Sequence, residues 1–423
     1  MDRQAEARKR YDQLKKALSD DGLVRKRTQR ARALGLVVVG AWAILPALLW
    51  SVDLNEFARP EFFRRPTAHE AYLLDLVHSE EVSLVTARAW EAASWWAIDG
   101  PLTVGSAYRE TGIFPDEPTA LGLRIHIPEG QRLRIDVDIS EGDPDRLFLD
   151  LFRAAPDTLR RPARVESGEL EDGRWSFDAD ETADYVLRLQ PELGEGLEYD
   201  LSIRVGARWV FPVADAGEGD IGGVFGDPRD GGSREHHGVD IFKPRGTAAL
   251  AAADGLVRRV DTTQIGGRVV WMREDDGEHN IYYAHLDRPL VEEGQRLQAG
   301  DTVGLIGNTG NARTTPPHLH FGAYRRGAVD PWNLILPQPP AAPSVSVDTG
   351  ILGMEGGVNG NGAELRRSPS TNGAVLAELP LEASIRFLAG AAGWYRVLLP
   401  DGRTGYVQGS MAQVPEPNGS HQE

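Results

Sequence analysis

The chain of 423 residues contains no cysteine. Disulfide bonds, thiolate metal sites and cysteine nucleophiles are therefore excluded, and the composition suits an oxidising compartment without specifying one. Basic residues are in deficit, with 46 Lys/Arg against 63 Asp/Glu and a formal net charge of −17. This charge argues against nucleic acid as a partner. The content of 41% hydrophobic and 26% charged residues is that of a globular protein. The length predicts roughly two to four domains.

The N-terminal part of the chain has one long apolar run, the uncharged stretch 33–52. About 20 apolar residues span the hydrocarbon core of a bilayer. The first 32 residues hold 11 Lys/Arg and 5 Asp/Glu, a net charge of +6, so the rest of a chain with net charge −17 carries −23. A basic flank stays on the cytoplasmic side of a membrane. We therefore expect a cytoplasmic basic segment at 1–32, a single-pass transmembrane anchor at 33–52 and an acidic extracytoplasmic body.

Two alternatives to the anchor are a cleaved signal peptide and a buried core helix. A signal peptide has a shorter apolar core, followed by a small-x-small cleavage site. The run in this chain ends "LLWSVDL" and has no such site. The length of the run and the change of charge across it argue against a core helix.

Helical and then strand-like patterns follow the apolar run. Residues 53–118 are expected to be a helical region, because "TAHE" is typical of a capping box with Thr67 at the N-cap and Glu70 at the third helical position. The glycine and proline of "DGP", residues 99–101, end the helical pattern. Residues 119–206 alternate apolar and polar residues in runs such as "QRLRIDVDI", which predicts an antiparallel β-sandwich.

The C-terminal half is rich in glycine and in short strand-like runs. We expect a β-rich domain at 207–337, a proline-rich extended linker at 338–350, a small β domain at 351–415 and a tail at 416–423. The predicted fold class is therefore multidomain and mainly β, with an N-terminal transmembrane helix and a helical segment before the sandwich.

Histidines are concentrated in the 207–337 domain, where six of the ten lie between positions 236 and 320. His318 and His320 are two residues apart in "PPHLHF", so on a strand both side chains point to the same face. The motif HExxH is absent, because "HEAYL" at His69 lacks the second histidine. A zincin mechanism with a glutamate base is thereby excluded.

His236 and His237 compete for one role beside Asp240. On an extended segment His236 and Asp240, four residues apart, share a face, whereas His237 points away. A bulge at Gly238 can reset this parity. We expect His236 to be the partner of Asp240, which makes His237 a natural control.

His236, Asp240 and one histidine of the HxH pair would form a site with three protein ligands and an open fourth position. This is the pattern of catalytic zinc, whereas structural zinc is closed by four protein ligands. The nitrogen and oxygen donors suit zinc. The other histidine of the pair and His285, in "YYAHL", are then free to move protons.

Five motifs in order resemble the LytM/lysostaphin-type zinc endopeptidases, peptidoglycan hydrolases with the duplicated hybrid motif fold. They are "SREHHGVDIF", "GTAALAAADGLV", "YYAHL", "EEGQRLQAGDTVGLIGNTGN" and "PPHLHFG", within residues 211–336. The resemblance implies one zinc ion per chain held by His236, Asp240 and His320. It also implies that His318 and His285 are the two catalytic histidines.

Two residues depart from the pattern of that family. Pro316 stands where glycine is usual, and Gly322 stands where glutamate is common, which bears on substrate preference. Arg234 fits the pattern. The last domain resembles a bacterial SH3 domain through "LRRSPS" and "GWYRVLLPDGRTGYV", which implies a small SH3-like β-barrel that docks on cell-wall peptide. An inert packing domain is the alternative.

The expected function is that of a membrane-anchored zinc metalloendopeptidase that cleaves peptide cross-links or stem peptides of peptidoglycan in cell-wall remodelling. We expect it in the inner membrane, with the N-terminus cytoplasmic and the catalytic part periplasmic. His318 would be the general base and His285 the oxyanion donor, although either could shuttle the proton. A non-catalytic regulator that activates another wall hydrolase is one alternative. An interaction scaffold built on the helical segment and sandwich is another.

Overall fold

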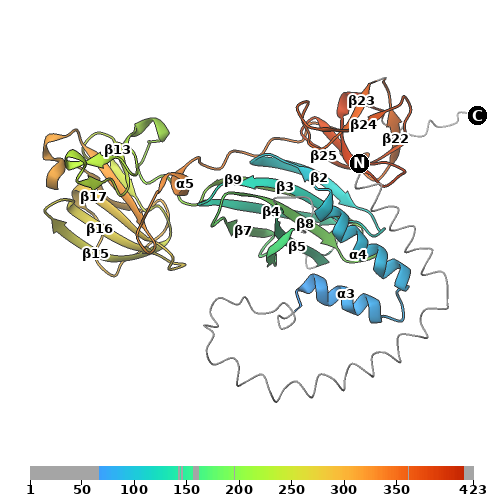
Figure 1. The fold of residues 1–423 in the computed structure, drawn as a ribbon, viewed down its shortest axis with the longest axis horizontal. Coiled ribbons are helices and arrows are strands. Elements are labelled where there is room, and N and C mark those ends of the chain that lie inside the picture. Colours follow the sequence, from blue (N-terminus) through green and yellow to red (C-terminus); the bar gives the residue numbers. More distant parts are fainter. Residues whose placement is uncertain are drawn as a thin grey trace, which may run out of the picture.

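The computed structural model describes residues 66–413, apart from 142, 144–145, 156–161, 195 and 361. The predicted cytoplasmic segment, the transmembrane anchor and the C-terminal tail lie outside the described residues. Within the described part of the chain, no helix combines the length and the hydropathy needed to cross a membrane. The described chain is mainly β and multidomain, with a helical hairpin at its start (Figure 1).

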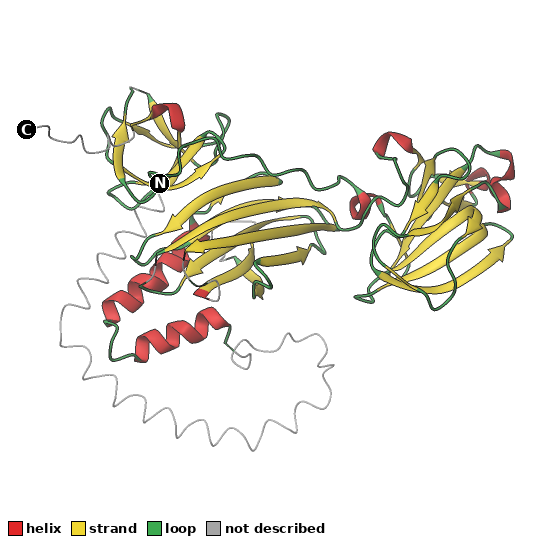
Figure 2. Cartoon of the chain, turned by 180° about the vertical axis from the view of Figure 1, so that it is seen from behind, coloured by secondary structure: helices red, strands yellow, loops and turns green. Residues whose placement is uncertain are grey.

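Two helices, α3 (Ala68–His78) and α4 (Leu84–Asp99), precede the strands. The capping box predicted at the start of α3 is confirmed, because Thr67 accepts from the Glu70 backbone and the Glu70 side chain accepts from the Thr67 backbone. In α4 the buried Trp90 donates its indole N–H to the Pro191 carbonyl at 2.8 Å. The hairpin therefore packs on the sandwich that follows it (Figure 2).

The sandwich consists of two sheets whose inner faces share one apolar core. One sheet has the strand order β1-β3-β8-β5-β6, and the other contains β2-β9-β4-β7. The strands are β1 (Leu102–Thr103), β2 (Ala107–Phe114), β3 (Leu121–Ile127), β4 (Gln131–Glu141), β5 (Leu147–Arg153), β6 (Ala163–Gly168), β7 (Arg174–Asp178), β8 (Ala183–Pro191) and β9 (Leu197–Ala207).

The first strands of the sandwich correct the predicted domain boundary. Residues 102–114 were assigned to the helical region, but β1 and β2 lie there, and β2 pairs with β9 from Ala107↔Arg204 to Phe114↔Leu197. The reason is Glu110, which occupies a core-facing position of β2 with no exposed surface. A glutamate at that position interrupts the apolar alternation that reveals a strand.

The next domain contains an antiparallel sheet with the order β10-β13-β20-β17-β16-β15-β18. Its core is the aliphatic and aromatic cluster between that sheet and its own loops. The strands are β10 (Ile221–Gly223), β11 (Pro228–Arg229), β12 (Arg234–Glu235), β13 (Val239–Phe242), β14 (Ala248–Leu250), β15 (Gly255–Thr263), β16 (Gly267–Glu274), β17 (Asn280–Pro289), β18 (Arg296–Leu297), β19 (Thr302–Ile306), β20 (His318–Tyr324) and β21 (Ala328–Val329).

Contacts at the end of this domain attach it to the sandwich. The short helix α5 (Trp332–Ile335) lies against β9, and the Pro337 carbonyl accepts from the Ala207 backbone at 2.7 Å. The buried Arg208 forms ion pairs with four carboxylates, and Asp178 of the sandwich is one of them at 3.3 Å. The structure has no helix or strand within residues 338–350.

The C-terminal domain is a small barrel at the opposite end of the sandwich from the histidine-rich domain (Figure 1). Its sheet continues into the sandwich, because β25 pairs with β2 at Gly390↔Thr111 and Ala389↔Gly112. The strands are β22 (Glu355–Val358), β23 (Ala363–Arg366), β24 (Val375–Leu379), β25 (Ile385–Ala391), β26 (Trp394–Leu398), β27 (Thr404–Gln408) and β28 (Ala412–Gln413).

A buried polar group fills the junction between the barrel and the sandwich. Arg396 of the barrel contacts Glu110 of the sandwich, with Nε 3.2 Å from Oε2. Three tyrosine hydroxyls surround this ion pair. We refer to these five residues as the interface cluster: Tyr108, Glu110, Tyr199, Arg396 and Tyr406.

Candidate metal centre

Two neighbouring strands bring most of the predicted site residues together. β13 and β20 are antiparallel, with Asp240 directly opposite His320 and Phe242 opposite His318. Alternate residues of a strand share a face, so Asp240, His318 and His320 all project from one side of the sheet. The HxH spacing thus acts through strand register, as the sequence predicts.

His236 reaches the same point from outside a strand. β12 ends at Glu235 and β13 begins at Val239, so residues 236–238 are not part of a continuous strand. His236 is buried, whereas His237 is exposed and its ring lies 6.2 Å from that of Phe225. The structure places His236 beside Asp240 and His237 at the surface, although the segment is not the extended strand that the prediction assumes.

Gly238 allows the loop to pass close to β20. A Cβ at this position would lie 2.3 Å from the Phe321 carbonyl oxygen and 3.0 Å from the His320 ring. Any larger residue would therefore push the loop away from the strand that carries His320. The glycine therefore acts through close backbone approach.

Three ligand atoms converge at this point. His236 Nε2 lies 3.0 Å from Asp240 Oδ1 and 2.9 Å from His320 Nδ1, and His320 Nδ1 lies 3.0 Å from Asp240 Oδ1. We call these three residues the ligand triad. Deprotonated, all three atoms are electron-pair donors, so a cation placed between them satisfies all three at once. Two imidazoles and one carboxylate are the ligand types of catalytic zinc, and three of them leave the fourth position open.

Backbone and side-chain partners fix the orientation of the ligand atoms. His236 Nδ1 lies 2.8 Å from the Val224 carbonyl, which can only accept, so Nδ1 carries the proton and Nε2 keeps its lone pair. Arg229 donates from Nη2 to Asp240 Oδ2 at 2.8 Å, which turns Oδ1 towards the histidines. Gly223 makes this contact possible, because a Cβ there would lie 2.6 Å from the Arg229 guanidinium.

Arg229 is a residue that sequence reasoning missed. It lies in β11, in a turn-rich stretch whose spacing gives no indication that its side chain returns to Asp240. Contacts of this kind orient metal ligands and tune their basicity. The sequence analysis names Arg234 as fitting the family pattern and assigns no residue to orient Asp240.

His318 and His285 lie beside the ligand triad. The rings of His318 and His285 are 4.9 Å apart, and His318 Nε2 lies 4.0 Å from Asp240 Oδ1. His318 Nδ1 donates to the Pro316 carbonyl and His285 Nδ1 to the Thr309 carbonyl, each at 2.9 Å. Each neutral ring therefore keeps its Nε2 lone pair for a proton.

The backbone of His285 is in an unusual conformation. Its φ of 61° lies in the left-handed region that non-glycine residues rarely adopt, and the register of β16 against β17 shifts at this point. His285 and the core residue Tyr283 would share a face on a regular strand, but the bulge turns the histidine towards His318. Strained residues and bulges are concentrated at functional sites.

Burial and mutual contacts set the charges in the site. Burial opposes the ionisation of Asp240, but hydrogen bonds and charge from His236 and His320 outweigh it and hold its pKa well below the usual value. Burial, with the nearby His318 and His320, lowers the pKa of His285 to about 4. Burial also lowers the pKa of His320, against the opposing effect of Asp240. These shifts favour the Asp240 carboxylate and the neutral imidazole of His320, which are the forms that bind a metal.

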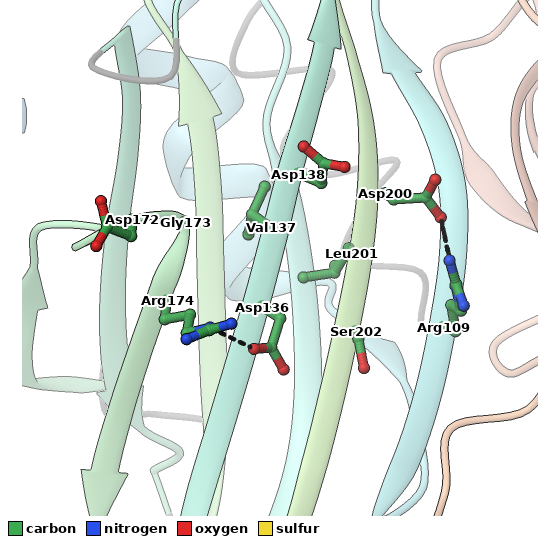
Figure 3. Close-up of a pocket in the computed structure, with 10 residues that line it drawn as sticks. All are labelled: Arg109, Asp136, Val137, Asp138, Asp172, Gly173, Arg174, Asp200, Leu201 and Ser202. Atoms are coloured by element: carbon green, nitrogen blue, oxygen red, sulfur yellow. Dashed lines mark hydrogen bonds and ion pairs between the residues drawn. The ribbon is translucent and has the colours of Figure 1, made fainter.

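A separate surface hollow of about 360 Å³ lies on the sandwich, far along the chain from the triad (Figure 3). Its arginines are already paired, Arg174 with Asp136 at 3.6 Å and Arg109 with Asp200 at 3.3 Å. It contains no histidine, and its lining is acidic and arginine-paired. The ligand triad is therefore the stronger candidate for chemistry.

The β domain thus brings together three residues that could hold a metal ion and places two further imidazoles beside them. Residues 234–331 match the family described as peptidase family M23, and residues 361–412 match the bacterial SH3 domain. The chain thus contains a LytM-type peptidase family M23 domain and a bacterial SH3 domain.

Similarity to known proteins covers part of the chain. Peptidoglycan DD-endopeptidase ShyC of Vibrio cholerae is 38% identical over 112 residues, which is 26% of this chain and 25% of that protein. Glycyl-glycine endopeptidase ALE-1 of Staphylococcus capitis is 40% identical over 87 residues, which is 20% of this chain and 24% of that protein. The solved structure of LytU is 37% identical, with 26% of this chain and 81% of that one covered and a TM-score of 0.25. This chain thus spans about a quarter of the length of these two curated relatives.

Proposed function

We propose that the protein is a zinc metalloendopeptidase that hydrolyses peptide bonds of peptidoglycan. The observation that carries the proposal is the ligand triad with two further histidines beside it, inside an M23 domain. Relatives that share this domain are named peptidoglycan DD-endopeptidase, DD-carboxypeptidase/endopeptidase and L-Ala–D-Glu endopeptidase. These names specify different peptide bonds. Mass spectrometry of digested fragments identifies the bond that this protein cleaves.

His236, Asp240 and His320 would hold the zinc ion. Bound zinc supplies Lewis-acid polarisation of the scissile carbonyl and lowers the pKa of water. The triad is fixed before any substrate arrives, because Val224 orients His236 and Arg229 orients Asp240. Such preorganisation places the reacting carbonyl and avoids reorganisation during the reaction.

His318 is the proposed general base. Its Nδ1 proton is engaged with Pro316, so Nε2 presents a lone pair 4.0 Å from Asp240 Oδ1, at the edge of the triad. From this position Nε2 takes the proton of the attacking water and later delivers it to the leaving amine. Proton transfer by a positioned histidine contributes about 10²–10⁴-fold to rate.

His285 is the proposed donor to the tetrahedral oxyanion. With Nδ1 committed to Thr309, neutral His285 has no second N–H, so it donates from Nε2 only when that nitrogen is protonated. Its ring lies 4.9 Å from His318, which allows the two histidines to exchange the proton during turnover. One proton is therefore exchanged between the two imidazoles, and either histidine can accept it first from the attacking water.

A non-catalytic regulator is the weaker candidate function. A regulator has no need for the ligand triad, for His318 and for the strained His285 together, and this chain has all five. We further propose that residues 33–52 anchor the enzyme in the inner membrane with its catalytic part in the periplasm. The SH3 domain, fixed at the far end of the sandwich, would hold cell-wall peptide at a set distance from the zinc site.

Mass spectrometry of wall fragments digested by the full chain tests the proposal. We expect new peptide termini with the zinc-loaded enzyme and none after chelation. His318→Ala should keep about one zinc per chain and lose turnover by about 10²–10⁴-fold, because its ring is not in the ligand triad. Cleavage by this variant at the wild-type rate contradicts the base assignment. Absence of new termini with zinc-loaded wild type contradicts the peptidase function.

A further inference from the structure

The strand face that carries the ligand triad continues beyond it. On β20, His318, His320, Gly322 and Tyr324 alternate on one face, and each second residue between them points to the core. Tyr282 of β17 pairs with Gly322, and Trp271 of β16 pairs with Tyr282. The two tyrosines and the tryptophan therefore stand on the same face as the zinc ligands, next to them.

This face is the outer one of the sheet. The residues between these positions, among them Tyr283, Phe321 and Met272, are fully buried in the domain core. The outward face of such an antiparallel sheet normally carries polar side chains. Three large aromatic side chains that are only partly buried at adjacent positions are therefore unusual there, and contiguous apolar surface marks a binding site.

We call Trp271, Tyr282 and Tyr324 the aromatic wall. Ring centroids are 4.4 Å apart for Trp271 and Tyr282, and 5.1 Å for Trp271 and Tyr324. The Tyr282 ring lies 5.9 Å from the ring of His320. The wall therefore begins in contact range of a zinc ligand and leads away from it along the sheet.

Neighbouring glycines leave room for the tyrosine rings of the wall. Tyr282 is hydrogen-bonded to the Thr263 side chain. A Cβ on Gly266 would lie 2.1 Å from the Tyr282 hydroxyl oxygen, so only glycine leaves room for this ring. A Cβ on Gly322 would lie 3.0 Å from both Tyr324 and the His237 carbonyl. The ring of Tyr324 thus occupies the space beside Gly322.

We propose that the aromatic wall is a peptide subsite that takes a small uncharged residue, of the alanine type, within about two residues of the cleaved bond. An extended peptide advances about 3.4 Å per residue, so a group that contacts a ring so close to His320 is near the reacting carbonyl. This inference rests on the proposed function, because it places the substrate beside the zinc site. Methyl groups pack on aromatic faces and edges, whereas a carboxylate would lose hydration there without a partner.

The arrangement of the rings favours peptide over glycan. The interplanar angles are 34° for Trp271 and Tyr282, 53° for Trp271 and Tyr324, and 81° for the two tyrosines. Rings tilted in this way present both faces and edges, against which methyl groups pack, and they form no single flat platform across the wall.

Direct binding measurements test the subsite without relying on turnover. The full chain with His318→Ala is titrated with cross-linked stem peptides freed of glycan, and with the same peptides still attached to glycan. We expect Trp271→Ala and Tyr324→Ala to raise Kd about tenfold for both probes, the effect of one lost ring contact. Trp271→Phe should restore most of the affinity. The matched control is Leu290→Ala, an exposed apolar residue of the same domain.

A second comparison tests the chemical class of the occupant. Replacing alanine by aspartate in the probe peptide should weaken binding to the His318→Ala protein, and should weaken it less when Trp271→Ala is added. Unchanged Kd in both wall variants overturns the subsite, as does a loss seen only with the glycan-linked probe. If peptide binds through the wall but zinc-loaded wild type cleaves nothing, the subsite stands and the peptidase function falls.

Discussion

Two groups of buried polar side chains lie in different parts of the molecule, one where the barrel meets the sandwich and one in the histidine-rich domain. They differ in where their positive charge comes from. In the interface cluster, Arg396 Nε lies 3.2 Å from Glu110 Oε2. The Tyr199 hydroxyl donates to Glu110 and accepts from Arg396. In the ligand triad, His236, Asp240 and His320 direct three electron-pair donors at one another, 2.9–3.0 Å apart. The first group supplies its own cation, whereas we propose that the second assembles ligands for a cation from outside the chain.

This difference distinguishes buried polar residues that fix the packing of two domains from those that are suited to bind a metal. A buried charge with an internal partner fixes how two elements pack, and losing one partner is costly. A set of converging donors is suited to a metal, because the metal satisfies them together. Burial opposes the charged form of Arg396, but Glu110 and the tyrosines outweigh it and raise its pKa. The charged forms of Asp240 and Arg396 are thus both favoured by their neighbours, against the effect of burial.

The largest expected effect on folding comes from breaking the interface cluster. Glu110→Gln leaves Arg396 fully buried without a counter-charge, which costs about 3–5 kcal/mol of unfolding free energy. The control is Glu91→Gln, which breaks the exposed i,i+3 pair with Arg88 and should cost less than about 1 kcal/mol. Denaturant titration of both variants makes the comparison. Equal stability of the two would mean that the cluster does not join the domains.

His69 is a buried histidine whose partners are side chains of the sandwich and of helix α4, in contrast to the histidines of the ligand triad. Its Nε2 contacts Gln190 at 2.7 Å and its ring stacks on Trp90 at 4.5 Å. Burial, then the charge of Arg188, lowers its pKa from 6.5 to about 4. Between these values the unfolded chain binds a proton that the folded chain does not. Stability from this residue is therefore complete above pH 6.5 and is lost as pH falls towards 4.

The expected loss over that pH range is at most about 3 kcal/mol. His69→Gln should flatten the profile of unfolding free energy between pH 6.5 and 4, even if it is less stable at neutral pH. The exposed His237→Gln serves as the control and should leave the profile unchanged. Parallel profiles for wild type and His69→Gln would show that this histidine does not titrate on unfolding as described.

A smaller effect is expected from the residue that orients the carboxylate of the triad. Arg229→Gln should weaken zinc binding about 10–100-fold, because Asp240 loses the partner that turns Oδ1 to the metal. Lys243→Gln removes a nearby positive charge that pairs with Asp220 instead, and should change zinc affinity little. Competition with a chromophoric chelator measures both constants. Equal shifts in the two variants would indicate general electrostatics and no orienting role.

Sequence reasoning was most successful where the relevant contacts are local or follow from strand register. Alternation on one strand places His318 and His320 together, and the capping box at Thr67 depends on four consecutive residues. The roles assigned to the five site residues remain predictions. The orientation of His285 depends on a positive φ at a bulge, which its motif does not encode.

Long-range burial explains what the sequence could not reveal. Glu110 is polar, so β2 lacked the pattern of a strand, and its partner Arg396 is 286 residues away. Arg229 reaches Asp240 across a turn and beside a glycine, without a spacing rule. In each case a polar residue is stabilised by a partner that only the folded chain brings near.

Metal analysis of two adjacent variants tests the central claim most directly. The full chain with His236→Ala and the full chain with His237→Ala are loaded with zinc, dialysed and measured for bound metal and for release of wall peptides. We predict that His236→Ala loses both the metal and the activity, whereas His237→Ala keeps about one zinc per chain and cleaves at close to the wild-type rate. Zinc retained by His236→Ala, or lost only from His237→Ala, would contradict the ligand triad.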